Sequence, residues 1–292
     1  MIRVERLDES DLDAIAALCE RSIADPPSVG ELHDTLFASD LPAVVLGDPS
    51  IGIVALAECD DGPHVRLLAV DPGARRRGCG NELLEAAEQW AREAGHSFLL
   101  VGADAPYFLW PGAPVRETAL LCLLESRHYR RVEANFDMDV DLGAIPADPG
   151  GHRLAEPEER CEIDQWMANH WPNWRLEVLR ALEKGNLVIA RGEGAAGAGA
   201  AGGAAAGGAA AGDLTAFCAF EVNRAGLLGP VAVRPDLLGR GAGRGVLVGA
   251  LHELRRRGRE RVSVVWVGPV VPSGLVGGRV SDVYFVYRRE LP

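Results

Sequence analysis

The stretch "VDPGARRRGCGNELLEAAEQW" (residues 70–90) decides how the rest of the chain is interpreted. It follows an apolar run typical of a strand and ends in apolar residues at helical spacing, so it predicts a strand, a turn and a helix. Gly78 and Gly80 fall where this helix would begin. The first N–H groups of a helix lack partners, and glycines let such groups close around a phosphate. With three arginines beside the glycines, the stretch predicts a loop that binds a diphosphate.

A second copy of this stretch occurs later in the chain. A shift of 163 residues places residues 69–101 on residues 232–264 with eleven identities in 33 ungapped positions. Ordinary composition would give roughly two or three identities. Both glycines recur, as Gly241 and Gly243. The chain is therefore expected to hold two copies of one domain.

We expect each copy to be an α/β domain of the mixed α+β kind, in which a mostly antiparallel mixed sheet is flanked by helices. The first domain is assigned to residues 1–143 and the second to residues 152–292, with a linker rich in Pro and Gly at 144–151. Between two strands of the second copy, residues 195–212 are only Ala and Gly. Such a tract has no large apolar side chain to bury, so we predict a disordered loop over residues 192–213.

Helices and strands are predicted from apolar periodicity and from glycines that end helices. In the first copy we expect helices at 11–22, 81–93 and 118–127 and strands at 43–46, 53–58, 65–70 and 97–101. In the second copy we expect a helix at 246–256 and strands at 187–190, 216–222, 228–233 and 262–267.

The overall composition excludes several classes of partner. A formal net charge of -12 argues against nucleic acid and against an anionic membrane surface. The six cysteines have no spacing typical of a metal site, so we expect no bound metal and free thiols in a reducing compartment. No signal peptide or long apolar run is found, which predicts a cytoplasmic protein. We expect a monomer or a homodimer.

Two common phosphate-binding motifs are absent. A P-loop requires Lys followed by Ser or Thr, and the sole lysine precedes Gly185. A dinucleotide fingerprint requires a third glycine, where the two copies have Leu83 and Val246. The pattern that does match is [RQ]-x-x-G-x-[GA] at a helix start, complete from Arg75 to Gly80.

This pattern resembles the acyl-CoA pyrophosphate loop of the GNAT acetyltransferase superfamily. The order of the elements around it agrees, and "PYFLWPGAP" (106–114), "LLCLLESRHYRRV" (120–132) and "NHWPNWRLEVLRAL" (169–182) are similar to a bacterial subset of tandem GNAT proteins. The resemblance implies an N-acetyltransferase that carries an acetyl group from acetyl-CoA, its acyl donor, to a primary amine of a small molecule or peptide. A catalytically inactive acyl-CoA-binding regulatory or scaffold protein remains the alternative, as does an acetyltransferase similar to the mycothiol synthases.

The resemblance also implies which residues bind CoA. In the first copy they are Leu68, Val70, Arg75, Arg76, Arg77, Gly78, Cys79, Gly80 and Asn81. In the second copy the corresponding residues are Val231, Val233, Gly239, Arg240, Gly241, Ala242 and Gly243. There Leu238 stands where Arg or Gln is expected, which leaves open whether the second copy binds CoA or is purely structural.

Catalytic residues are harder to assign. Leu124 occupies the position of the tyrosine that gives a proton to the thiolate in many family members, and the second copy has no tyrosine in the matching region. Glu58 and Glu221 at strand ends are candidate bases, and Tyr107 is a candidate near the cleft, although each is also explained by solvation or packing. His64 and His170 are expected to be exposed.

Overall fold

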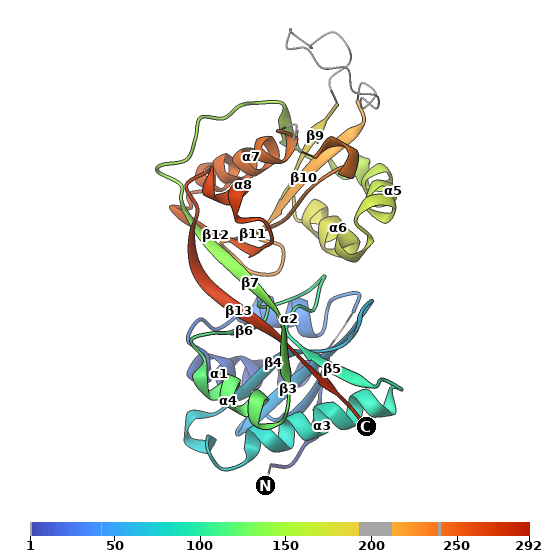
Figure 1. Ribbon diagram of the computed structural model, residues 1–292, viewed down its shortest axis with the longest axis vertical. Coiled ribbons are helices and arrows are strands. Elements are labelled where there is room, and N and C mark those ends of the chain that lie inside the picture. The colour runs from blue at the N-terminus through green and yellow to red at the C-terminus, as the bar shows by residue number, and fades with distance from the viewer. Residues whose placement is uncertain (1, 42, 193–211, 239–240) are drawn as a thin grey trace. The chain divides into compact units, whose positions relative to one another are not determined.

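The computed structural model describes residues 2–41, 43–192, 212–238 and 241–292. Most of the tract predicted to be disordered therefore lies outside the described residues. The chain divides into two compact units, Met1–Phe136 with Asp282–Pro292, and Asp137–Ser281 (Figure 1). The C-terminal segment thus belongs to the first unit. The proposed linker at 144–151 lies in the second unit and contains no helix or strand, and the domain limits 1–143 and 152–292 stay predictions.

The first unit contains one mixed sheet. Its strands follow the order β1-β2-β3-β4-β5-β13, with β6 paired to β13. Only β4 and β5 pair in parallel, and the other neighbours named here are antiparallel, which confirms the predicted kind of sheet. The strands are β1 (Glu5–Leu7), β2 (Val44–Asp48), β3 (Gly52–Cys59), β4 (Gly62–Val70), β5 (Phe98–Val101), β6 (Ala113–Pro114), the first part of β7 (Arg130–Asp141) and the last part of β13 (Arg279–Glu290).

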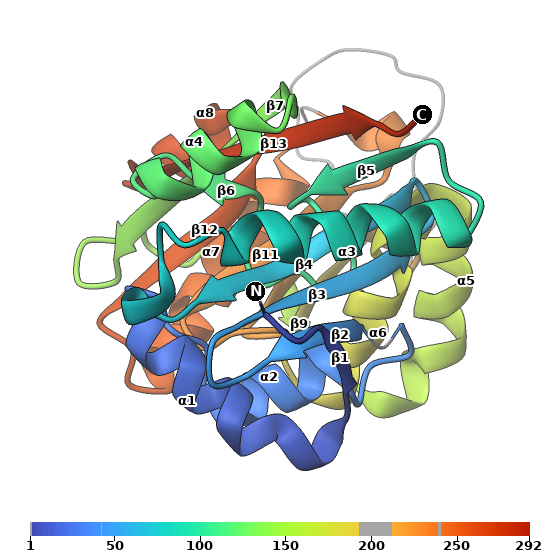
Figure 2. The same cartoon turned by 90° about the horizontal axis from the view of Figure 1, so that it is seen from below.

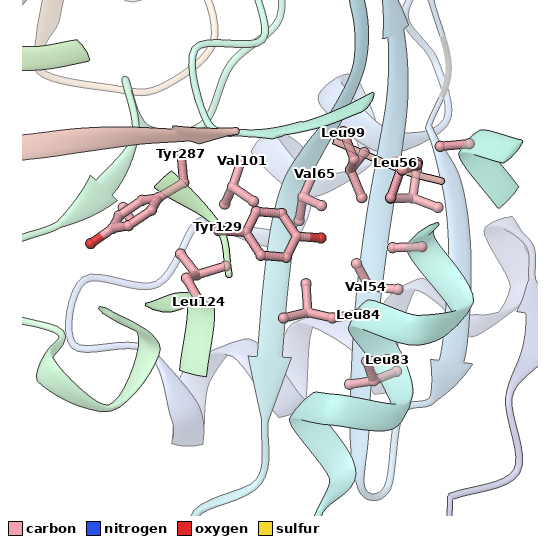
Figure 3. Close-up of a cluster of buried hydrophobic side chains, with 14 of the residues drawn as sticks. Val54, Leu56, Val65, Leu83, Leu84, Leu99, Val101, Leu124, Tyr129 and Tyr287 are labelled. Atoms are coloured by element: carbon pink, nitrogen blue, oxygen red, sulfur yellow. The ribbon is translucent and has the colours of Figure 1, made fainter. Parts of the chain in front are cut away.

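Helices cover both faces of this sheet (Figure 2). They are α1 (Leu12–Ser22), α2 (Val29–Leu36), α3 (Cys79–Glu93) and α4 (Thr118–Ser126). On one face, Leu83 and Leu84 of α3 pack with Val54, Val65 and Leu99 of the strands (Figure 3). On the other face, α1 and α2 bury residues such as Ile15 and Leu32 against a second set of strand residues. Burial of each such side chain is worth roughly 1.5–3 kcal/mol, so these two clusters stabilise the unit.

The second unit repeats the arrangement. Its strands β8 (His152–Leu154), β9 (Leu187–Arg191), β10 (Leu214–Phe220), β11 (Leu227–Val233) and β12 (Arg261–Val267) follow that order in the sheet. Its helices are α5 (Arg160–His170), α6 (Arg175–Glu183), α7 (Ala242–Arg256) and α8 (Val270–Gly274). Helix α7 begins and ends 163 residues after α3, and β11 ends 163 residues after β4. The repeat found in the sequence is thus confirmed, and the predicted elements differ from these bounds by only a few residues at each end.

Among the described residues, no helix is both long enough and apolar enough to cross a lipid bilayer.

Candidate functional site: a cavity in the first unit

The site forms where β4 and β5 separate. These strands pair only through His64 with Leu100 and Val65 with Val101, and the N–H of Gly102 donates the next bond to the Val65 oxygen at 3.1 Å. β5 ends there, while β4 continues to Val70. The remaining residues of β4 therefore present one edge that is not covered by β5.

A β-bulge at Arg66 determines which atoms this edge presents. Ala55 pairs with Leu67 and Leu56 with Val65, so Arg66 is an extra residue on β4. Beyond the bulge, the N–H of Asp71 donates to the Ile51 oxygen at 2.8 Å, toward β3. Main-chain groups alternate in direction along a strand, so the N–H groups of Leu68 and Val70 point toward the uncovered side.

The start of α3 supplies a second set of main-chain donors. Gly78 is the residue before the helix and has φ +93°, a conformation that favours glycine. The N–H groups of Asn81 and Glu82 both bond to the Gly78 oxygen, at 2.9 and 3.1 Å. The N–H groups of Gly78, Cys79 and Gly80 are therefore the ones that a helix leaves for an anion.

The side chain of Arg75 is held by main-chain oxygens. Its Nε donates to Val70 at 3.2 Å and its Nη2 to Ser22 at 2.7 Å. It thus ties the end of β4 to the last residue of α1. Its predicted contact with a diphosphate stays a prediction, and these bonds show a structural role that the motif did not indicate.

Helix α4 forms the opposite wall. Ala119, Cys122, Leu123 and Ser126 lie at helical spacing and all face the cavity. A Cβ built on Gly80 would lie 2.8 Å from Leu123 Cδ2, so the absence of a side chain at Gly80 leaves room for Leu123 of α4. Leu124, at the expected tyrosine position, is fully buried in the α3 core and cannot reach the cavity (Figure 3).

These walls enclose a cavity of about 600 Å³, within the range of small-molecule sites. Seven of the nine residues predicted for the first copy line it, and Arg77 and Cys79 do not. The seven are Leu68, Val70, Arg75, Arg76, Gly78, Gly80 and Asn81. Sequence reasoning missed the segment after α1, Trp110, residues 112–114 and residues 116–117, which also line it. Only the spacing of the α4 residues gave a signal that could have been recognised in advance.

The weak catalytic candidates lie elsewhere. Glu58 is an exposed residue whose carboxylate is 2.7 Å from His96. The Tyr107 ring is buried and its hydroxyl donates to Asp40 at 3.1 Å. Glu221, in the second unit, accepts from Arg259 Nε at 2.7 Å. None of the three lines the cavity described here.

The two histidines expected to be exposed are not. His64 is fully buried, and His170 is half-buried with its ring 5.0 Å from that of Trp166. The expectation for both was wrong, because His64 on β4 is paired with Gly102 and Asp61 inside the fold and His170 at the end of α5 packs on Trp166.

The equivalent place in the second unit has a similar backbone. Gly241 precedes α7 with φ +91°, as Gly78 precedes α3. Ala242 and Gly243 begin α7, and Val231 and Val233 lie on β11. Gly239 and Arg240 lie outside the described residues.

The strand end in this unit is bound differently. The Val233 oxygen accepts from Trp171 Nε1 at 3.3 Å, where the equivalent Val70 oxygen accepts from Arg75. A Cβ on Gly243 would lie 2.8 Å from Val233 Cγ2. The glycine therefore accommodates a strand side chain here, whereas Gly80 accommodates α4.

Within the described ranges, no group of three or more His, Cys, Asp or Glu side chains is placed to hold a metal ion.

Comparisons with known proteins agree with this geometry. Residues 16–106 match the model of the Acetyltransferase (GNAT) family. A comparison with curated proteins found no match. Among solved structures, a GCN5-related N-acetyltransferase from Sphaerobacter thermophilus has a TM-score of 0.70 at 20% identity, over 99% of this chain and 95% of that one. A tandem GNAT protein from the clavulanic acid biosynthesis pathway has a TM-score of 0.66 at 16% identity, over 99% of this chain and 98% of that one.

A third structure is part of a longer protein. That protein is a fungal multi-domain GH3 β-N-acetylglucosaminidase, which has a GCN5-related glucosamine N-acetyltransferase region. The structure has a TM-score of 0.77 to this chain at 20% identity. The match covers 99% of this chain and spans only 38% of the fungal chain. The comparisons lead to one conclusion: residues 16–106 are similar to the GNAT acetyltransferase family, and nearly the whole chain shares its fold with a tandem GNAT protein.

Proposed function

We propose that the protein is an N-acetyltransferase that binds acetyl-CoA in the first unit and transfers the acetyl group to a primary amine of a small molecule or peptide. One observation carries this proposal. A single cavity runs from the start of α3, along the uncovered edge of β4, to the segment at residues 112–117. In this proposal the diphosphate binds at the start of α3, and the thioester and the acceptor amine bind farther along the same cavity.

Each part of the chain has a role in this proposal. The N–H groups of Gly78, Cys79 and Gly80 bind the diphosphate, and Arg76 adds a positive charge at the cavity wall. The main chain of Leu68 and Val70 pairs with the pantetheine arm. An N–H of the same edge polarises the thioester carbonyl, as in an oxyanion hole.

The transfer itself needs two proton movements. The amine nitrogen bonds to the acyl carbon, the carbon–sulfur bond breaks, the amine loses a proton and the thiolate gains one. Of the side chains that α4 turns to the cavity, Cys122 carries a thiol and Ser126 donates to the Leu123 oxygen at 2.8 Å. We therefore take Cys122 as the candidate donor to the thiolate, with water as the other source.

A second candidate function is an acyl-CoA-binding protein without turnover. The observation that favours it is that Glu58, Tyr107 and Glu221 lie outside the cavity lining and Leu124 is buried. Main-chain binding of CoA requires none of these side chains, so binding would persist without catalysis.

Release of free CoA tests both candidates. Wild type would be incubated with acetyl-CoA and a panel of amino sugars, amino acids, polyamines and peptides; the glucosamine N-acetyltransferase region found among the similar structures puts amino sugars first. Gly78→Glu and Gly241→Glu form a matched pair, because both glycines precede a helix with nearly the same φ, +93° and +91°.

Acceptor-dependent release that Gly78→Glu abolishes and Gly241→Glu keeps supports the enzyme. Thermal stabilisation by CoA without release for any amine supports the binding protein. No stabilisation of wild type by CoA would exclude both.

A further inference from the structure

The turn after β5 has an unusual backbone. Gly102 has φ +79° and Ala103 has φ +59°, and a residue with a side chain at positive φ is strained. A Cβ on Gly102 would lie 2.3 Å from Gly112 Cα. Because Gly102 and Gly112 both line the cavity, the conformation of this turn helps to set the shape of the cavity wall.

Two buried basic side chains, Arg66 and His64, hold this turn. Arg66 Nε donates to Asp104 Oδ2 at 2.5 Å, and both side chains are fully buried. His64 Nδ1 lies 2.8 Å from the Gly102 oxygen. Its other ring nitrogen, Nε2, lies 2.9 Å from Asp61 Oδ1.

The hydrogen bonds of His64 select its charged form. A neutral imidazole has one N–H and one acceptor nitrogen, whereas both ring nitrogens of His64 face oxygens that only accept, the carbonyl of Gly102 and the carboxylate of Asp61. Only the imidazolium satisfies both contacts. We propose that His64 is a buried imidazolium that positions the 102–104 turn, so that the cavity wall loosens when His64 loses its proton.

The charges that face His64 come from several elements. Asp61 lies in the turn between β3 and β4, Asp104 follows β5, and Arg66 on β4 pairs with Asp104. The Cys59 thiol at the end of β3 stays protonated nearby, because burial raises its pKa to about 12. One exposed carboxylate and one buried ion pair thus surround the imidazolium.

The pKa of His64 follows from these contacts. Burial opposes the charge and by itself lowers the pKa, but the hydrogen bond to Asp61 and the nearby Asp104 carboxylate raise the pKa above its ordinary value. A raised pKa in the folded state means that the stabilisation is complete below the unfolded pKa. It is lost as the pH rises through the folded pKa. The cavity wall is therefore expected to loosen on the alkaline side.

A histidine NMR titration tests this without any ligand. We expect the His64 ring to show both nitrogens protonated at about pH 6.5, the ordinary pKa of histidine, and to titrate only above it. The amide signals of Gly102 and Gly112 should shift with the same midpoint. A His64 ring that is neutral at that pH would overturn the proposal. Glycine amides that do not follow its titration would do so as well.

Variants then separate positioning from folding. His64→Gln keeps one donor and one acceptor but has no charge, so the Gly102 and Gly112 signals should no longer titrate. Asp61→Asn should keep the fold and move the His64 midpoint to lower pH. His33→Gln is the control, since this half-exposed histidine pairs with Glu9 at 3.1 Å, away from the turn. Glycine signals that titrate unchanged in His64→Gln would contradict the inference.

A ligand readout rests on the proposed function. The affinity for acetyl-CoA should fall as the pH rises through the His64 midpoint in wild type and stay level in His64→Gln. If wild type binds no acetyl-CoA at any pH, the proposed function fails while the NMR result stands. If affinity is independent of pH while the NMR signals titrate together, the turn responds to His64 without affecting ligand binding, and the proposed loosening of the cavity wall is wrong.

Discussion

Arg75 Nε lies 3.2 Å from the Val70 oxygen, and Trp171 Nε1 lies 3.3 Å from the equivalent oxygen of Val233. The same carbonyl, at the end of the same strand of each repeat, is thus bound by two unrelated side chains from different parts of the unit. Leu238, which replaces the arginine in the second copy, therefore does not leave this carbonyl without a donor. The arginine of the motif therefore has a structural role in the first copy, because it binds main-chain oxygens of Val70 and Ser22.

Arg75→Leu reproduces the second copy in the first unit. Removing two hydrogen bonds from an exposed guanidinium should cost about 1 kcal/mol of unfolding free energy. Urea denaturation measures this, with Arg77→Leu as the control of equal charge change. An equal loss in the two variants would show that the Val70 and Ser22 contacts contribute nothing.

Gly102→Ala should be far more costly than Gly95→Ala. Both glycines have positive φ, +79° and +90°, so both substitutions carry the backbone penalty of roughly 1–2 kcal/mol. A Cβ on Gly102 also overlaps Gly112 at 2.3 Å, whereas a Cβ on Gly95 meets nothing within 4 Å. The difference between their unfolding free energies should exceed about 1 kcal/mol. Similar values would show that residues 102 and 112 separate easily.

Glu88→Gln should destabilise the first unit strongly. The buried carboxylate of Glu88 receives Arg127 Nη2 at 2.9 Å, Tyr129 Oη at 3.2 Å and Arg289 Nη1 at 2.5 Å. Loss of a buried charge that pairs with cations costs about 3 kcal/mol. Glu125→Gln is the matched control, since this half-exposed carboxylate pairs with Arg131 and should cost at most about 1 kcal/mol. Thermal and urea unfolding would compare them, and equal losses would contradict the account.

Glu159 should make the stability of the second unit fall markedly at acid pH. Hydrogen bonds from Arg153 lower the pKa of Glu159 from 4.5 to about 2. Partial burial opposes this shift, and the N–H of Glu156 and the Arg191 side chain add to it. A lowered pKa in the folded state gives stability that is present above the unfolded pKa and disappears as the pH falls toward about 2. The free energy of unfolding of wild type should therefore exceed that of Glu159→Gln by about 2 kcal/mol near neutral pH.

Unfolding curves of both proteins across this pH range provide the check. A difference in stability that does not shrink between about pH 4.5 and pH 2 would mean that the Glu159 ion pairs do not supply it.

The repeat and the glycine loop were predictable because they depend on local chemistry. Gly78 and Gly241 stand at the starts of equivalent helices with positive φ, and the sequence pattern alone located both. The resemblance to the GNAT superfamily also assigned Leu68 and Val70 to the CoA site, and both residues line the cavity.

What the sequence could not reveal depends on contacts between distant segments. The partners of His64 come from a turn three residues before it and from Gly102, 38 residues later. The C-terminal strand belongs to the first unit, where Tyr287 pairs with Val101. No local sequence pattern predicts this pairing. Trp110 lies in a loop without periodicity, and the similar stretch at 106–114 gave no indication that this side chain lines the cavity.

Calorimetric titration with acetyl-CoA tests the central claim, that the first-unit cavity binds the acyl donor, most directly. Arg76 and Arg77 are adjacent exposed arginines, of which only Arg76 lines the cavity. A charge-assisted hydrogen bond to phosphate is worth about 1.5–3 kcal/mol, so Arg76→Glu should weaken binding at least about tenfold. Arg77→Glu should have a small effect that salt screens. Equal affinities for wild type and Arg76→Glu, or no binding by wild type, would contradict the assignment of acyl-CoA to this cavity.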